Sequence, residues 1–82
     1  MRLPRDLSGR DLIGLLRRYG YELNRQIGSH IRLRPNFRGY PHSVTVPDHD
    51  NLRLGTLNSI LSDVAEYFAT DRSQIIKELF EK

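Results

Sequence analysis

The chain has no cysteine, one methionine and only two lysines among its 82 residues. The absence of cysteine excludes a disulfide scaffold, a thiolate nucleophile and a cysteine-ligated metal cluster. The longest apolar stretch, at positions 12–16, is far too short to cross a bilayer. Positions 1–6 carry charges with no apolar segment behind them, so we expect no secretory signal, no membrane contact and a cytoplasmic location.

Charge is unevenly distributed along what we expect to be one small domain over residues 1–82. Residues 1–40 hold nine arginines against three acids, a net charge of +6, whereas residues 41–82 hold four basic residues against seven acids, a net charge of −3. Arginine grips phosphate with two parallel hydrogen bonds. The basic half therefore fits either a phosphate-bearing partner such as nucleic acid or an ordinary solvated surface.

A first helix is expected between Ser8 and Gly20. Ser8 is suited to cap it, with Asp11 three residues later as a capping-box partner. Gly20 is a natural stop because glycine readily adopts the left-handed conformation. Apolar residues recur between these two ends at helical spacing, at Leu12, Ile13, Leu15, Leu16 and Tyr19.

Three runs of alternating apolar and polar residues follow, over positions 21–26, 30–34 and 42–46. Gly28 and Ser29 supply the first turn, and Pro35, Asn36 and Gly39 mark the second. The alternation directs these apolar side chains inward: Tyr21, Leu23, Ile31, Leu33, Val44 and Val46. The pattern predicts an antiparallel meander with one apolar and one polar face.

Two more helices are expected after a polar loop from Asp48 to Leu54. One begins near Gly55 and Thr56, and the other is capped by Thr70. Their apolar residues also follow helical spacing, at Leu57, Ile60, Leu61, Val64 and Phe68, then at Ile75, Ile76, Leu79 and Phe80. The order α-β-β-β-α-α predicts a two-layer α+β domain whose helices cover the apolar sheet face.

The polar face of this sheet carries residues suited to act on a phosphate. His30, Arg32 and Arg34 line the central strand, and their expected neighbours are Asn24, Gln26, Ser43 and Thr45. Histidine can take or give a proton near neutral pH, and arginine stabilises charge that builds on a phosphorus centre. RNA carries its own nucleophile, the 2′-hydroxyl, so an enzyme that cleaves it needs only a proton acceptor and charge stabilisation.

The turn before the histidine has two interpretations. Gly28 lets the backbone approach a ligand closely, and the amides of such a turn can point at a phosphate. The competing interpretation is a hairpin turn followed by an ordinary exposed histidine. The residue pattern alone leaves both open.

A metal site is not expected. The intervals of twelve and seven residues between His30, His42 and His49 fit no ligand spacing, and no acidic cluster is present to hold magnesium. We therefore expect neither a metal nor another cofactor.

Phe37 and Tyr40, in the second turn, are candidates for stacking on bases.

The run from Gly20 to His30, Gly-Tyr-Glu-Leu-Asn-Arg-Gln-Ile-Gly-Ser-His, closely resembles the HicA toxins. In that family an aromatic strand leads through Arg-Gln into a Gly-Ser-His turn. The segments Val44–Pro47 and Leu54–Leu61, with His49 between them, are similar to the third strand and the following helix start of the same family. The resemblance runs in order over roughly residues 8 to 80.

The resemblance implies a fold like a double-stranded-RNA-binding domain and an mRNA-cleaving activity that arrests translation. Our hypothesis is a metal-independent endoribonuclease. The resemblance also implies a HicB-type antitoxin that blocks the active surface, and no DNA binding by the toxin alone. The family's catalytic histidine falls on His30, as general base or general acid. The substrate-binding residues that we expect around it are Arg25, Gln26, Gly28, Ser29, Arg32 and Arg34.

The chain departs from the family pattern at three places. Ile31 stands where many members carry a second histidine, and the turn at 35–39 differs from the commoner Pro-Asp-Gly form. The segment 63–72 is longer than in compact members.

Two other functions remain as alternatives. One is an RNA-binding module without catalysis, and the other is a protein-interaction module, whose binding would be insensitive to salt.

Overall fold

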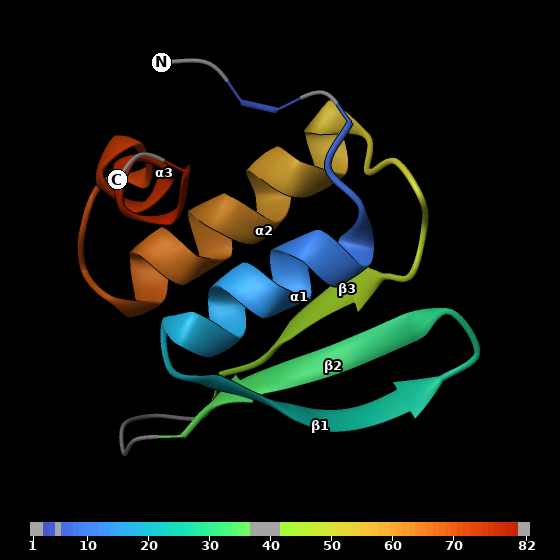
Figure 1. The fold of residues 1–82 in the computed structure, drawn as a ribbon. Helices are drawn as coiled ribbons and strands as arrows, with labels where there is room; N and C mark the ends of the chain where they lie inside the picture. The colour runs from blue at the N-terminus through green and yellow to red at the C-terminus, as the bar shows by residue number, and fades with distance from the viewer. Residues whose placement is uncertain (1–2, 5, 37–41, 81–82) are drawn as a thin grey trace.

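The computed structural model describes residues 3–4, 6–36 and 42–80, and its elements follow the expected order (Figure 1). The elements are α1 (Gly9–Arg18), β1 (Tyr21–Ile27), β2 (His30–Pro35), β3 (Val44–Pro47), α2 (Leu54–Tyr67) and α3 (Arg72–Phe80). The predicted α+β class and the order of helices and strands are confirmed. The third strand is shorter than expected, because His42 and Ser43 precede it.

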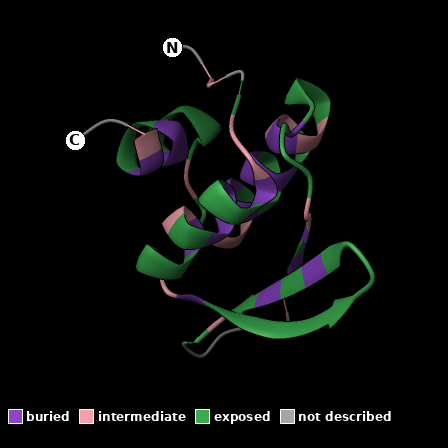
Figure 2. Ribbon diagram, turned by 45° about the vertical axis from the view of Figure 1, so that its right-hand side comes forward, coloured by how far each residue is buried: buried purple, intermediate pink, exposed green. Residues whose placement is uncertain are grey.

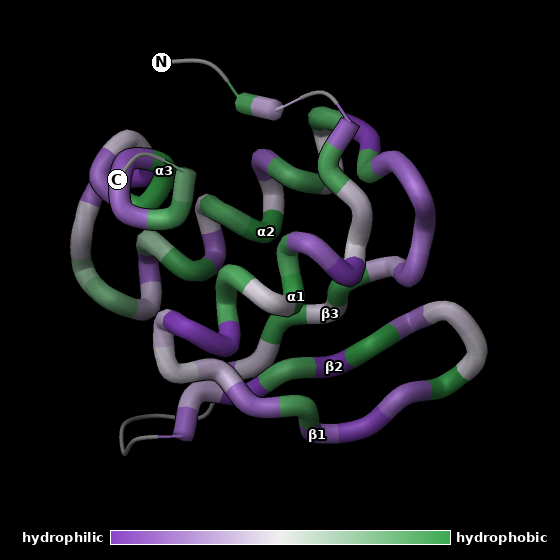
Figure 3. The backbone as a smooth tube through the Cα atoms, viewed as in Figure 1, coloured by the Kyte–Doolittle hydropathy of each residue, from purple (hydrophilic) through white to green (hydrophobic). Residues whose placement is uncertain are grey.

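The three strands form one antiparallel sheet in the order β1-β2-β3. Helices α1 and α2 lie over one face of this sheet, and α3 packs against α2 (Figure 1). No element among the described residues covers the opposite face, which we call the outer face. The hydropathy of β2 alternates along the strand (Figure 3), as expected for a strand with one buried and one solvated side.

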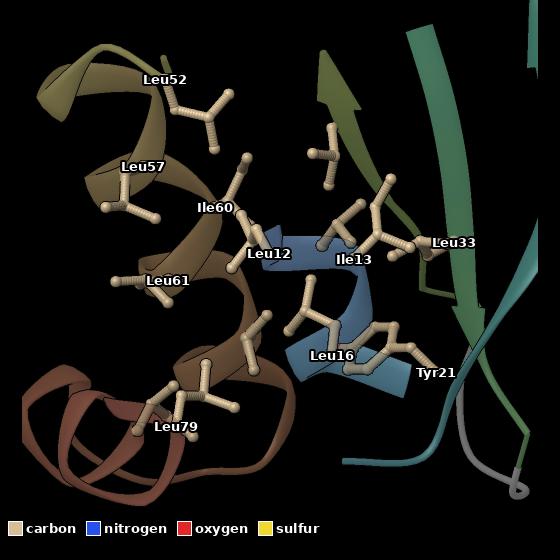
Figure 4. Packing of buried hydrophobic residues seen from close by; sticks show 14 of the residues in the cluster. Leu12, Ile13, Leu16, Tyr21, Leu33, Leu52, Leu57, Ile60, Leu61 and Leu79 are labelled. Carbon is tan, nitrogen blue, oxygen red and sulfur yellow. The ribbon is translucent and has the colours of Figure 1, made fainter. Parts of the chain in front are cut away.

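The core fills the space between the helices and the sheet (Figure 4). Of the six strand residues expected to point inward, five are buried, but Leu23 is 55% exposed. Leu23 lies opposite buried Leu33 in the register, so it does face the helix side. Its exposure arises because β1 is an edge strand that is exposed along nearly its whole length (Figure 2). Leu52, in the loop expected to be polar, is buried.

A capping box and a close backbone contact fix the start of α1. Ser8 Oγ accepts from the backbone N–H of Asp11 at 3.0 Å, and the Asp11 carboxylate accepts from the N–H of Ser8 at 3.3 Å, so the predicted capping box is confirmed. Gly9 packs directly against the end of β3. A Cβ at this position would overlap the carbonyl of Pro47, and the Gly9 N–H donates to the His49 carbonyl at 2.9 Å.

The end of α2 forms a Schellman motif with alanine in the left-handed position. Ala69 has φ of 55°, its N–H donates to the Glu66 carbonyl at 3.1 Å, and the Thr70 N–H donates to the Ala65 carbonyl at 2.9 Å. The expectation that Thr70 caps the last helix is wrong. α3 begins at Arg72, and the carbonyl of Asp71, directly before it, accepts the first bonds of the helix.

We expect Ala69→Gly to stabilise the protein by about 0.5–1 kcal/mol. Glycine adopts a positive φ without the steric cost that a Cβ imposes, although it also gives the unfolded chain more freedom. Urea denaturation followed by circular dichroism would measure the change. Ala65→Gly, inside α2, is the matched control and should destabilise by a similar or larger amount. A lower midpoint for Ala69→Gly would contradict this account.

Candidate nucleic-acid interface

A row of three cationic or titratable side chains runs along the outer face of β2. His30, Arg32 and Arg34 are exposed and alternate with buried Ile31 and Leu33. The alternation places all three on the side of the sheet away from the helices. The expectation that the imidazole is exposed next to a tight turn is therefore confirmed.

A β-bulge in β1 changes which residues join this row. The register pairs Leu23 with Leu33 but Arg25 with Arg32, so one extra residue, Asn24, is inserted. An extra residue reverses the alternation beyond it. Arg25 therefore shares the outer face with Arg32.

The bulge also moves two other side chains of β1. Gln26 pairs with buried Ile31 and Ile27 pairs with His30, so Gln26 lies on the helix side and Ile27 on the outer face. The expectation that Gln26 lies on the outer face is wrong. That expectation assumes unbroken alternation along β1, and no residue pattern in β1 indicates a bulge.

His30 lies in a shallow hollow of about 220 Å³ on the outer face. We call this the His30 hollow, and its lining residues are Arg25, Ile27, His30, Arg32 and Thr45. Two guanidinium groups and one imidazole thus border the same space. A phosphate there would meet two bidentate donors and one group able to transfer a proton.

Two hydrogen bonds hold the turn that precedes His30. Gly28 has φ of 58° at the first of two turn positions, a conformation that glycine adopts without strain. Gln26 Nε2 donates to the Gly28 carbonyl at 3.0 Å, and the Asp48 N–H donates to the Ser29 carbonyl at 2.7 Å. These bonds fix the backbone next to His30.

Asp48 connects this turn to α1. Its carboxylate accepts two hydrogen bonds from the Arg10 guanidinium, at 3.1 and 3.0 Å. No local pattern in the sequence indicates this brace, because the two residues are 38 positions apart and neither lies in a motif. Among the described residues this is the one ion pair, so no acid pairs with the arginines of the outer face there.

A second hollow, of about 300 Å³, adjoins the first. We call it the Arg34 hollow, and its lining residues are Asn24, Arg32, Arg34, His42 and Ser43. Arg32 borders both hollows. His42 closes the far end, where Asp63 and Glu66 of α2 line the next hollow with it.

His42 has a structural role that its sequence position did not reveal. Its Nε2 lies 2.9 Å from the Tyr21 hydroxyl, and its ring stacks on Tyr67 with centroids 4.3 Å apart and planes 7° from parallel. Burial lowers the pKa of His42 from its ordinary value of 6.5, and the carboxylates of Asp63 and Glu66 partly oppose this change. The fold therefore favours the neutral ring.

This preference predicts that acid weakens the fold through His42. Well above pH 6.5 the ring is neutral in both the folded and the unfolded chain, so its contribution to stability is complete. As the pH falls below 6.5 the unfolded chain binds the proton first, and the free energy of unfolding decreases. Thermal melts between pH 7 and pH 5 should show a smaller decrease for His42→Gln than for wild type. His49→Gln, at an exposed position, is the control, and an identical decrease in His42→Gln would refute the prediction.

Other expectations concern ligands and membranes. Within residues 3–4, 6–36 and 42–80, no three His, Cys, Asp or Glu side chains come together in a group that could hold a metal ion. No helix in the described part of the chain is long and apolar enough to span a membrane.

Phe37 and Tyr40, expected to stack on bases, lie outside the described residues. Tyr21 is fully buried and Phe68 packs against the core, so these two aromatic residues are structural.

Comparison with known proteins gives one match. A family model described as "HicA toxin of bacterial toxin-antitoxin" matches residues 9–65, which span α1, the sheet and most of α2. No curated protein and no solved structure matches the chain. The matched segment contains every residue that lines the His30 hollow and the Arg34 hollow.

Proposed function

The chain belongs to the HicA toxin family, and on this premise we propose that it acts as an endoribonuclease that cleaves mRNA. Family membership makes it the toxin component of a toxin–antitoxin system. The observation that carries the proposal is the His30 hollow, in which an exposed imidazole and two guanidiniums border the same space. This combination supplies a proton-transfer group and charge stabilisation, the two functions that RNA cleavage requires of a protein.

The reaction follows from these groups. A ribose 2′-hydroxyl loses its proton and attacks the adjacent phosphorus, the bond to the 5′-oxygen of the next nucleotide breaks, and that oxygen gains a proton. His30 serves either as the base for the first proton or as the acid for the second. Arg25 and Arg32 neutralise the charge that accumulates on the phosphoryl oxygens.

The remaining expected binding residues take different places in this proposal. Gly28 and Ser29 lend backbone amides of the turn to the phosphate. Gln26 contributes through its hydrogen bond to the Gly28 carbonyl, which holds the turn in place. Arg34 lies in the adjoining hollow and contacts RNA beyond the reacting group. None of these steps uses a metal ion.

The antitoxin is the second partner in the proposal. A HicB-type protein would neutralise the toxin by covering the outer face, which no described element of the chain itself covers. The positive charge of this face favours an acidic antitoxin surface. Because the same arginines would serve RNA and antitoxin, the two partners would compete.

Substrate chemistry tests the proposal. Purified protein incubated with RNA in the presence of EDTA should yield fragments, and DNA of the same sequence should stay intact. RNA with a single 2′-deoxy nucleotide at a mapped cleavage position should also resist at that position, since the nucleophile is missing. Gel analysis of end-labelled substrates measures all three. RNA that is bound but never cut would favour the non-catalytic RNA-binding module instead.

A further inference from the structure

The outer face provides two adjacent hollows bordered by arginines, whereas a single reacting phosphate needs only one. The His30 hollow and the Arg34 hollow share Arg32 and together follow β2 from its first residue almost to its last. Residues on one side of a strand are roughly 6.7 Å apart when they are two positions apart. That step is close to the separation of successive phosphates in an extended single strand of RNA.

The arginines of these hollows form no ion pair with an acid among the described residues. Arg25 and Arg32 are direct register partners, and like charges opposite each other destabilise a sheet. Glu22 is the register partner of Arg34, but the one ion pair among the described residues is elsewhere, between Arg10 and Asp48. Bound anions would relieve the repulsion between the guanidiniums.

The Arg34 hollow also has neutral donors suited to phosphate oxygens. Asn24 is the bulge residue, and Ser43 lies just before β3. An amide and a hydroxyl beside two guanidiniums give a mixed donor set like those that hold phosphate and sugar groups in nucleic-acid complexes. The bulge therefore has a chemical consequence, because it brings Arg25 to the outer face beside Asn24.

The arginines that line the two hollows form a cationic track along the outer face, and this track ends at His42. On its far side the next hollow contains Asp63 and Glu66, whose carboxylates repel phosphate. Among the described residues that line these hollows, the arginines that would attract RNA lie between His30 and His42. The track has room for about two consecutive phosphates at the spacing of the strand.

We propose that the Arg34 hollow, formed by Asn24, Arg32, Arg34 and Ser43, binds a second RNA phosphate next to the one at His30. This inference rests on the proposed function for its choice of ligand. Single-stranded RNA then lies along β2, and the second phosphate fixes which phosphodiester bond faces the imidazole.

RNA binding by a non-cleaving variant tests this subsite without depending on catalysis. In the His30→Ala background, fluorescence anisotropy with a short labelled single-stranded RNA would give the dissociation constant at several salt concentrations. Arg34→Gln should weaken binding by about tenfold and reduce the slope of log affinity against log salt by about 0.7. Arg17→Gln, an exposed arginine on α1, removes the same charge from the helix layer and should change neither value.

Two more variants separate geometry from charge. Arg34→Lys should keep the salt slope but bind less tightly, because lysine lacks the planar fork. Asn24→Ala with Ser43→Ala should weaken binding at an unchanged slope. Equal behaviour of Arg34→Gln and Arg17→Gln would overturn the second phosphate site, and so would RNA binding whose affinity does not change with salt. Failure of the wild-type protein to cleave RNA would instead overturn the proposed catalysis.

Discussion

Replacement of His30 by alanine is expected to reduce the rate of RNA cleavage by about a hundred- to ten-thousandfold, the usual contribution of a general acid or base. The imidazole is exposed at the start of β2 and takes no part in the core. Its loss should therefore leave the melting temperature almost unchanged. Arg25 and Arg32 would still bind the phosphate, so affinity for RNA should decrease far less than the cleavage rate.

Single-turnover cleavage of a defined RNA, together with thermal melts, measures both quantities. His49→Ala is the matched control, because His49 is also exposed and lies outside both hollows. It should cleave at the wild-type rate. If His30→Ala retained more than about a tenth of the wild-type rate, a loss too small for a general acid or base, another group would have to transfer the proton.

Gly9→Ala is expected to destabilise the protein by about 1–3 kcal/mol, the usual cost of forcing extra atoms into a packed region. The new Cβ would overlap the Pro47 carbonyl, which is backbone and cannot rotate away. Pro47 is the register partner of His30, so any shift of β3 that makes room also moves the strand end beside the imidazole. We therefore expect the cleavage rate to fall as well, even under conditions where the variant is folded.

Gly14→Ala provides the control within the same helix. A Cβ at Gly14 meets nothing within 4 Å, so alanine there should stabilise α1 by about 0.5–1 kcal/mol and leave cleavage unchanged. Urea denaturation and cleavage assays on both variants would separate the close contact from the general effect of alanine on a helix. Equal stabilities of the two variants would show that the chain relaxes around Gly9 at little cost.

Local patterns in the sequence predicted most of the fold. The capping box at Ser8, the alternation of β2 and the helical spacing from Leu57 to Val64 all depend on residues close together in the chain. The same is true of the exposed position of His30, since a turn residue and one alternating strand determine it. These features follow from short-range rules that hold in almost any surroundings.

The errors arose where distant parts of the chain decide the structure. The bulge at Asn24 depends on how β1 pairs with β2, and it moved Gln26 away from the outer face. His42 packs between Tyr21 and Tyr67, a structural role that no local pattern indicates. The Arg10–Asp48 brace joins the N-terminal helix to the loop after β3. No spacing rule connects residues this far apart.

The irregularity in β1 has one more consequence, for solubility. Leu23 and Ile27 are 55% and 64% exposed on a strand at the margin of the sheet. A straight strand with such residues invites another copy to add its own backbone and start a growing aggregate. An inserted residue interrupts the ladder and bends the strand, and Arg25 adds a repelling charge. The feature that brings Arg25 to the outer face thus also discourages this chain from polymerising with itself.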